Sequence, residues 1–236
     1  MALQHEIRTN HLRPAAELAE RVLLPGDPAR ALAVAQALFE EAPRMFNHAR
    51  GLWGYTGTAP DGELLTVQAT GMGGPSAAIV CEELIALGAR TLVRIGTCGA
   101  LDSDIEPGTL LAVERALPAD GTSAALGANG ALAPDPGLLA RLVEAGARPA
   151  TVATSDLFYD PREETTAAWV ERGAVAVEME AATVFQVAAR RDVAAACVLG
   201  VSDVTTGDGA RRMSDDDLAD LGVRVGEAGY AAVRSR

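Results

Sequence analysis

The chain has 236 residues, of which 49% are hydrophobic and 22% are charged, a composition typical of a globular protein with a sizeable core. Its 20 Lys and Arg residues are outnumbered by 32 Asp and Glu residues, so the formal net charge is −12. Because nucleic-acid binding needs a basic surface, this charge argues against a nucleic-acid partner. No apolar run reaches the roughly 18–20 residues of a membrane-spanning helix, and the N-terminus is too polar for a signal peptide. We therefore expect a cytoplasmic protein with no membrane partner.

The cysteines and histidines predict neither disulfides nor a metal site. Cys81, Cys98 and Cys197 are odd in number and form no CxxC pair. The three histidines are spread widely along the chain. We therefore expect no metal and no cofactor.

Short apolar runs alternate with helical patterns along the chain. The runs predict strands at 21–26, 63–70, 91–96, 109–117, 174–180 and 194–203. Helices are predicted at 28–42, 74–89, 181–191 and from about 214 to 233. This alternation indicates an α/β fold with a largely parallel sheet, and we interpret 1–236 as a single domain. The Gly-, Ala- and Pro-rich stretch from Pro118 to Gly137 is interpreted as a surface loop or irregular insertion, not as a domain linker.

Ligands of open α/β sheets bind at the carboxyl ends of the strands. Nearly every predicted strand end carries glycine, a small polar residue or a carboxylate: Gly26 to Pro28, Gly71 to Ser76, Gly96 to Gly99, Glu178 to Glu180, and Ser202 with Asp203. This pattern predicts a site that is assembled from several loops.

Two of these strand ends carry an arginine that is suited to an anion. In "LLPGDPARA", Gly26 allows close backbone approach, and the following helix start and Arg30 favour an anion. The alternative is an ordinary turn with Asp27 as the helix cap. In "TLVRIGTCGA", Arg94 lies in an apolar strand, where an arginine is costly unless it is paired. Two interpretations follow. Either Arg94 and Thr97 bind a phosphate, or Arg94 forms a buried ion pair with Glu178 or Glu180.

Carboxylates and aromatic residues mark the other strand ends. In "AVEMEAATVF", Glu178 and Glu180 can accept the hydrogen bonds of a ribose diol, or complement the dipole of the helix that follows. Asp203 in "GVSD" is a candidate proton donor, or a turn residue. In "SDLFYD", Phe158 and Tyr159 offer a surface for stacking on a flat base, or cover the core.

These segments together resemble the hexameric purine nucleoside phosphorylases and uridine phosphorylases. The matching stretches are "VLLPGDPARA", "ARGLWGYTGT", "TGMGGPSAAIVCEELIALGARTLVRIGTCGAL", "SDLFYD", "AVEMEAATVF" and "GVSD", and they run in family order from about residue 5 to 204. The resemblance implies a mixed, partly barrel-like sheet flanked by helices. It also implies reversible phosphorolysis of a nucleoside, with inorganic phosphate as a co-substrate and no cofactor.

The resemblance also implies a role for each matching residue. The phosphate-binding positions are Gly26, Arg30, Arg50, Arg94 and Thr97, with Arg50 contributed by a neighbouring subunit. The ribose-binding positions are His5, Met179 and Glu180, with His5 also reaching from a neighbour. The base pocket comprises Cys98, Gly99, Phe158, Val177, Glu178 and Ser202. The catalytic positions are Asp203, which protonates purine N7, and an arginine matched by Arg211 or Arg212.

Asp203 decides the predicted substrate class. Uridine phosphorylases lack an aspartate there and grip uracil with a Gln and an Arg; this chain has Asp203 and Arg162 but no such Gln. A purine substrate is therefore favoured, with uridine or 5′-methylthioadenosine as alternatives. A hydrolytic nucleosidase, which uses water in place of phosphate, is a less favoured alternative, because such enzymes lack the "GDPxR" loop and the partnered arginines. Sites shared between subunits imply a homo-oligomer, in the family's usual form a hexamer built as a trimer of dimers.

Overall fold

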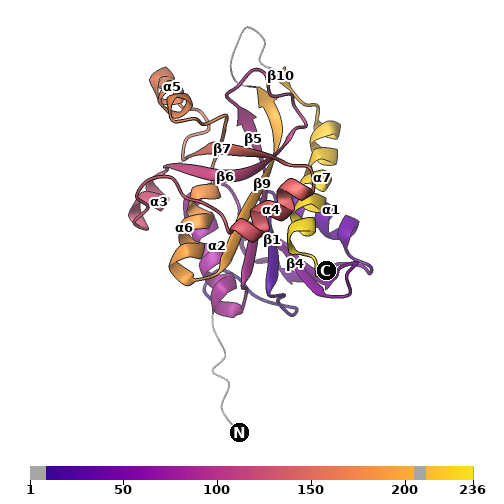
Figure 1. The fold of residues 1–236 in the computed structure, drawn as a ribbon. Coiled ribbons are helices and arrows are strands. Elements are labelled where there is room, and N and C mark those ends of the chain that lie inside the picture. The colour runs from indigo at the N-terminus through magenta and orange to yellow at the C-terminus, as the bar shows by residue number, and fades with distance from the viewer. Residues whose placement is uncertain (1–8, 205–210, 236) are drawn as a thin grey trace.

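A computed structural model describes residues 9–204 and 211–235. Its ten strands form one mixed sheet in the order β10-β9-β6-β7-β8-β5-β1-β4-β3-β2, with helices on both sides (Figure 1). The predicted α/β class with a central, helix-flanked sheet is confirmed. None of the helices in the described ranges is long and apolar enough to cross a membrane.

The first half of the chain builds one wing of the sheet. Its elements are β1 (Arg21–Leu24), α1 (Pro28–Leu38), β2 (Arg44–Asn47), β3 (Gly54–Thr58), β4 (Leu64–Gln68), α2 (Gly74–Leu87) and β5 (Thr91–Ala100). Strand β1 is parallel to both β4 and β5, while β2 and β3 add an antiparallel edge.

The second half closes part of the sheet into a barrel. Its strands are β6 (Leu110–Ala119), β7 (Arg148–Ser155), β8 (Ala176–Glu178), β9 (Ala194–Val204) and β10 (Arg211–Arg212). Strand β9 pairs with β6 on one side and with β5 on the other, so that β5, β9, β6, β7 and β8 form a closed ring. The partly barrel-like sheet expected from the resemblance is therefore present.

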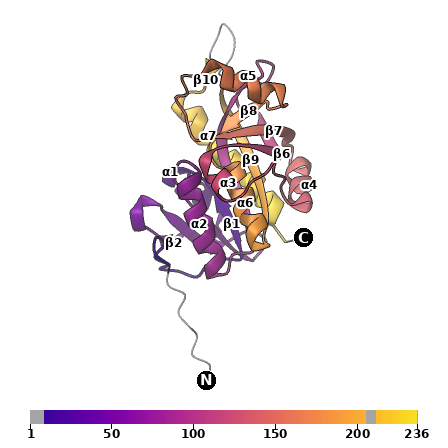
Figure 2. The same ribbon diagram turned by 90° about the vertical axis from the view of Figure 1, so that its left-hand side faces the viewer.

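Helices cover the two faces of the sheet as separate layers. The remaining helices are α3 (Gly121–Ala125), α4 (Pro136–Glu144), α5 (Glu163–Glu171), α6 (Ala181–Arg191) and α7 (Asp215–Val233). Helices α2 and α6 pack on one face, and α1, α4 and α7 pack on the other (Figures 1 and 2). Because side chains alternate along a strand, neighbours in β5 enter different cores: Leu92 faces α2 and α6, whereas Val93 faces α1 and α7.

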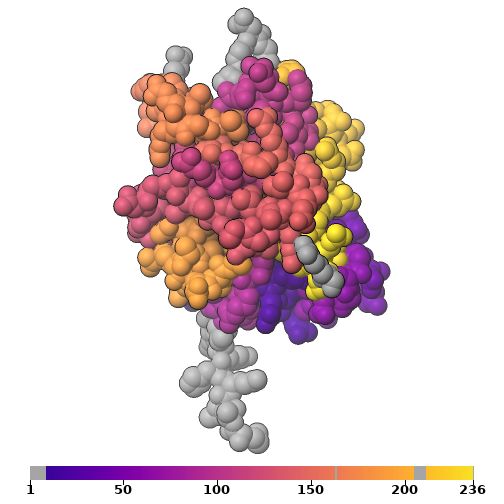
Figure 3. Space-filling model, in the orientation of Figure 1, coloured from indigo at the N-terminus to yellow at the C-terminus, as the bar shows by residue number. Residues whose placement is uncertain are grey.

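The C-terminal helix α7 packs against elements from the first half of the chain. The yellow helix α7 lies against the purple N-terminal segments in Figure 3. This close approach depends on glycine, since a Cβ on Gly226 would lie 2.6 Å from Val34, and one on Gly222 would lie 3.2 Å from Arg30 Nε. Helix α7 therefore packs against the side chain of Arg30.

The interpretation of Pro118 to Gly137 as a surface loop was partly wrong. The stretch contains the end of β6, the short helix α3 and the start of α4, and Leu132 bridges to Ala116. An aspartate in a Gly-, Ala- and Pro-rich stretch usually indicates a solvated turn. Here, Asp120 is instead buried and caps α3.

Candidate active site

A cavity of about 520 Å³ opens at the carboxyl ends of the strands, where the sequence predicts a site. Residues of five predicted strand ends meet there. The predicted site residues that line it are Gly26, Arg30, Arg94, Thr97, Cys98, Gly99, Phe158, Val177, Glu178, Met179, Glu180, Ser202 and Asp203. Segments as far apart in sequence as Gly26 and Asp203 are thus brought into one space.

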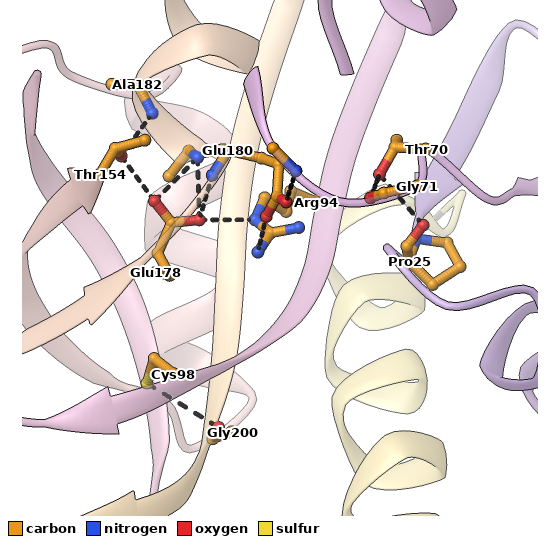
Figure 4. Close-up of polar contacts among 12 residues, drawn as sticks. Pro25, Thr70, Gly71, Arg94, Cys98, Thr154, Glu178, Glu180, Ala182 and Gly200 are labelled. Atoms are coloured by element: carbon orange, nitrogen blue, oxygen red, sulfur yellow. Dashed lines mark hydrogen bonds and ion pairs between the residues drawn. The ribbon is translucent and has the colours of Figure 1, made fainter. Parts of the chain in front are cut away.

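The loop after β1 forms one wall of the cavity and is tied to the loop after β4. Gly71 N–H donates to the Gly26 carbonyl at 3.1 Å, and Thr70 N–H donates to the Pro25 carbonyl at 2.8 Å; the two loops lie together in Figure 4. Asp27 caps α1 by accepting from Ala29 N–H at 2.9 Å. The capping alternative for Asp27 is therefore confirmed, and the cavity still receives the side chain of Arg30.

Arg30 is partly buried at the cavity, near charged groups of both signs. Burial lowers the pKa of its guanidinium, and the neighbouring charge of Arg94 lowers it further, while Asp27 and Glu180 act in the opposite direction. Arg30, Arg94 and Glu180 are therefore close enough to interact electrostatically.

Arg94 forms a buried ion pair with both of the glutamates considered from the sequence. Its Nε lies 2.9 Å from Glu178 Oε2, and its Nη2 lies 2.5 Å from Glu180 Oε2 (Figure 4). Burial alone would lower the pKa of Arg94, but the two carboxylates outweigh it and raise the pKa. Gly96 makes room for this arrangement, since a Cβ there would lie 2.7 Å from Arg94 Nη2.

Glu178 is saturated with hydrogen-bond donors. Besides Arg94, it accepts from the Thr154 hydroxyl at 2.5 Å, from Glu180 N–H at 2.9 Å and from Ala181 N–H at 2.9 Å (Figure 4). The last two N–H groups open helix α6, so Glu178 serves as the helix-dipole carboxylate weighed from the sequence. Its position in the cavity wall also keeps it beside the predicted base pocket.

Glu180 lies between Arg94 and the start of helix α2. Its Oε1 accepts from Gly73 N–H at 2.5 Å, and its Oε2 contacts Arg94. Burial raises the pKa of Glu180, the charge of Arg94 opposes this, and the charge of Glu178 adds to it. The two glutamates therefore differ: Glu178 organises the protein, and Glu180 has the fewer protein donors and borders the cavity.

Ser202 and Asp203 line the cavity together because β9 contains a bulge. In the pairing with β5, Cys98 is opposite Val201 and Gly99 is opposite Asp203, so Ser202 is the extra residue. Such bulges re-aim side chains beside active sites. The Ser202 hydroxyl lies 2.6 Å from Asp203 Oδ1 and 3.2 Å from the Cys98 carbonyl.

Arg211 and Arg212 form strand β10, which pairs with β9 and places Arg212 opposite Asp203 in the ladder. Arg211 Nη1 lies 2.7 Å from Glu106. Neither arginine lines the cavity. Their proposed catalytic role stays a prediction.

Phe158 and Tyr159 follow β7 and are both exposed, with 67% and 89% of their surfaces accessible. The alternative that both cover the core is therefore wrong. Their rings meet edge to face at 4.9 Å, and only Phe158 of the two lines the cavity.

Arg50, which is assigned to a neighbouring subunit's site, is not among the described residues that line this cavity. Arg50 is exposed in the short helix η1 (Ala49–Gly51), with a left-handed φ of 59°. A non-glycine residue with such a φ is strained and is a mark of functional segments. His5 lies outside the described residues.

Sequence reasoning assigned no individual binding role to some of the lining residues, namely Asp27, Pro28, Gly71, Met72, Gly96 and Leu157. All of them except Leu157 lie in the strand-end segments that the sequence predicted to form the site. Met72 is 85% exposed and Leu157 is 49% exposed. Their places within "GMGG" and "DLFYD", in two of the segments considered from the sequence, were the available signal.

Fold and cavity define an α/β protein with a part-closed sheet and a small-molecule site at the carboxyl ends of its strands. The sequence profile of the phosphorylase superfamily matches residues 20–235, and the chain belongs to this superfamily.

Several curated relatives share most of the chain. A purine nucleoside phosphorylase of the DeoD type from Geobacillus kaustophilus is 39% identical over 204 residues, covering 81% of this chain and 84% of the relative. Proteins of the same name from Caldanaerobacter subterraneus (38% identical; 79% of this chain, 84% of the relative) and Jannaschia sp. (39% identical; 79% and 83%) are similar to it as well.

Proposed function

We propose that this protein is an enzyme that catalyses phosphorolysis of purine ribonucleosides and deoxyribonucleosides to the free base and ribose or deoxyribose 1-phosphate. The observation that carries this proposal is the meeting of Arg30, Arg94, Glu180 and Asp203 in one cavity. The superfamily membership and the names of the curated relatives agree with it. Pentosyl transfer to phosphate needs an anion site, a sugar site and an acid for the leaving base, and this cavity has candidates for all three.

The phosphate end is proposed to comprise Gly26, Arg30, Arg94 and Thr97. In a chain with a net charge of −12, an inorganic anion needs locally concentrated arginines, and two converge here. Arg94 is held in place by Glu178, so its guanidinium is oriented before a ligand arrives.

The sugar is proposed to bind at Glu180 and Met179. A carboxylate accepts both hydroxyl hydrogen bonds of a ribose diol. Glu180 Oε2 contacts Arg94, so a phosphate that binds to Arg94 would compete with Glu180 for the guanidinium and release Glu180 Oε2 for the sugar. Binding of the two substrates is then mutually supportive.

The base is proposed to lie toward Cys98, Gly99, Phe158, Val177 and Ser202. Arg94 and Cys98 are four residues apart in β5, which separates the two ends by about 13 Å. Asp203 borders the base end.

In the proposed reaction, a phosphate oxygen forms a bond to C1′ as the bond from C1′ to the purine nitrogen breaks. The bonding electrons leave with the base, and Asp203 donates a proton to purine N7 so that a neutral base departs. The sugar, now bonded to phosphate at C1′, is the product ribose 1-phosphate. The developing positive charge on the sugar lies near the Glu180 carboxylate.

The active unit is proposed to be a homo-oligomer, a hexamer built as a trimer of dimers, with Arg50 and His5 serving a neighbour's site. Support comes from Arg50, which is exposed, strained and outside its own cavity. We further propose that the enzyme works in the cytoplasm without metal or cofactor.

The test is cleavage of inosine, adenosine, 5′-methylthioadenosine and uridine, each with and without phosphate. Phosphate-dependent release of a purine base supports the proposal, and the ranking names the preferred substrate. Preferential cleavage of uridine would contradict the role of Asp203, and cleavage without phosphate would indicate a hydrolase. With Arg50→Ala, the KM for phosphate should rise by about tenfold or more, as for loss of one charge-assisted hydrogen bond. An unchanged KM would contradict the shared site.

A further inference from the structure

The junction between β6 and α3 is buried although it looks like a surface turn in sequence. Asp120 is only 4% exposed and follows Ala119, which pairs with Ser155 at the end of β7. Strands β6 and β7 thus end side by side, one leading to Asp120 and the other to the Leu157 and Phe158 loop of the cavity.

The Asp120 carboxyl group connects α3 to α6. Its Oδ2 accepts from Ser123 N–H at 2.7 Å, which caps α3, and from the Thr183 hydroxyl at 3.0 Å. Its Oδ1 is buried and has no partner among the described residues. A buried unpaired carboxyl oxygen lowers stability, so capping a five-residue helix does not by itself account for this group.

Thr183 lies directly behind Glu180. It belongs to the first turn of α6, three residues after Glu180, and its Oγ1 is 2.7 Å from where a Cβ of Gly74 would lie. Gly73, the preceding residue, donates its N–H to Glu180 Oε1. Holding Thr183 therefore holds together the two helix starts that enclose the Glu180 carboxylate.

The same junction holds the aromatic loop. Gly121 N–H donates to Asp156 Oδ2 at 2.7 Å. Asp156 directly precedes Leu157 and Phe158, which line the cavity. We call the contacts of Asp120 with Thr183 and of Gly121 with Asp156 the Asp120 clamp.

We propose that Asp120 is a positioning residue that sets the distance between Glu180 and Phe158, and hence the fit of a nucleoside between its sugar and base contacts. The proposal rests on the proposed function, because it assigns the sugar to Glu180 and the base to Phe158. Asp120 does not line the cavity, so it acts through Thr183 and through the backbone of Gly121. The phosphate-binding arginines lie outside the clamp.

Three variants test the clamp against a matched control. Asp120→Ala removes the carboxyl group, Thr183→Val removes only the hydroxyl that contacts it, and Asp120→Asn keeps an oxygen that accepts both hydrogen bonds. Asp135→Ala is the control: Asp135 caps α4 through Leu138 N–H at 2.9 Å, as Asp120 caps α3, but α4 packs on the opposite face of the sheet from α6. Calorimetry measures the Kd of inosine without phosphate, and initial rates give the KM values for inosine and phosphate.

We expect Asp120→Ala and Thr183→Val to raise the Kd and KM of inosine by about tenfold, as for the loss of one buried hydrogen bond that positions a ligand group. The KM for phosphate should change by less than about threefold, and Asp120→Asn should stay within about threefold of wild type for both substrates. An unchanged Kd in Asp120→Ala, or an equal rise in Asp135→Ala, would overturn the proposal.

Amide hydrogen exchange tests the Asp120 clamp independently of the proposed function. Asp120→Ala should speed amide exchange in residues 154–159 and 180–184, whereas Asp135→Ala should not. Wild-type protein that bound no inosine would refute the proposed function, and exchange would still decide whether Asp120 holds the two segments. Unchanged exchange in both segments would refute the clamp itself.

Discussion

Replacing Glu178 with glutamine tests whether this carboxylate organises the core of the site. The side chain of Glu178 is fully buried, and its neighbours are all donors: Arg94 Nε, the Thr154 hydroxyl and the N–H groups of Glu180 and Ala181. Glutamine keeps the shape but removes the charge and turns one acceptor into an NH₂ group. That group must then face N–H and O–H donors.

The size of the effect follows from these contacts. Removing one partner of a buried ion pair costs about 3–5 kcal/mol of unfolding free energy. Arg94 keeps its contact with Glu180 at 2.5 Å, which reduces the loss. The misplaced amide adds about 1–3 kcal/mol for buried groups that lose their acceptor. These two corrections act in opposite directions, so we expect a net loss of about 3–5 kcal/mol, and at about 2–4 °C per kcal/mol a melting temperature lower by about 6–20 °C.

Thermal unfolding at one fixed protein concentration measures this change, since the stability of an oligomer depends on concentration. Glu82→Gln is the matched control, because Glu82 pairs with Arg191 at 2.5 Å while their side chains are 30% and 55% exposed. An exposed pair of this kind contributes about 1 kcal/mol or less. If Glu178→Gln lowered the melting temperature no more than Glu82→Gln, the organising role of Glu178 would be refuted.

Three further predictions concern the acid, the arginine and the thiols. Asp203→Asn should lower kcat for inosine by about 10²–10⁴-fold but spare a nucleoside with an activated leaving group, and equal losses in both rates would remove Asp203 from the acid role. In Gly96→Ala the new Cβ would lie 2.7 Å from Arg94 Nη2 and displace the guanidinium, so the rise in melting temperature caused by phosphate should be abolished. An undiminished rise would show that Arg94 still binds phosphate after this displacement. Burial raises the pKa of the Cys81 thiol to about 12, while an unfolded cysteine titrates near pH ~8.5, so its stabilising contribution should be complete below that pH and be lost as the pH rises toward 12. Urea unfolding at pH 8 and pH 10 should show this loss, and Cys81→Ala should reduce it; an identical loss in the variant would assign it to other groups.

Local pattern was sufficient for most elements around the site. The apolar run at 91–96 predicted a strand, and β5 occupies Thr91–Ala100. Its last four residues read as a loop because Gly99 and Ala100 are weak strand formers, but β8 and β9 supply the hydrogen-bond partners that extend it. The run at 181–191 predicted helix α6, which begins at Ala181 as expected.

The residue types at the strand ends predicted the site better than they predicted its contacts. Arg94 in an apolar strand left two alternatives, a phosphate ligand or an ion pair with one of the glutamates. The pairing is with both glutamates, and Arg94 still lines the cavity. Sequence spacing cannot decide between partners that lie more than 80 residues away, because their distance depends on how β5 and β8 are aligned.

The sequence by itself determined the α/β class, the strand ends that carry the site and most of the cavity lining, because these depend on hydrophobic periodicity and on which polar residues interrupt it. Only the tertiary structure decided that the sheet closes at β9, that a bulge turns both Ser202 and Asp203 toward the cavity, and that Glu178 and Glu180 divide their tasks. It also showed that Asp120, in a stretch that resembles a loop, is buried behind Glu180. These features depend on pairing and burial between distant segments, and a one-dimensional pattern does not encode the distance between them.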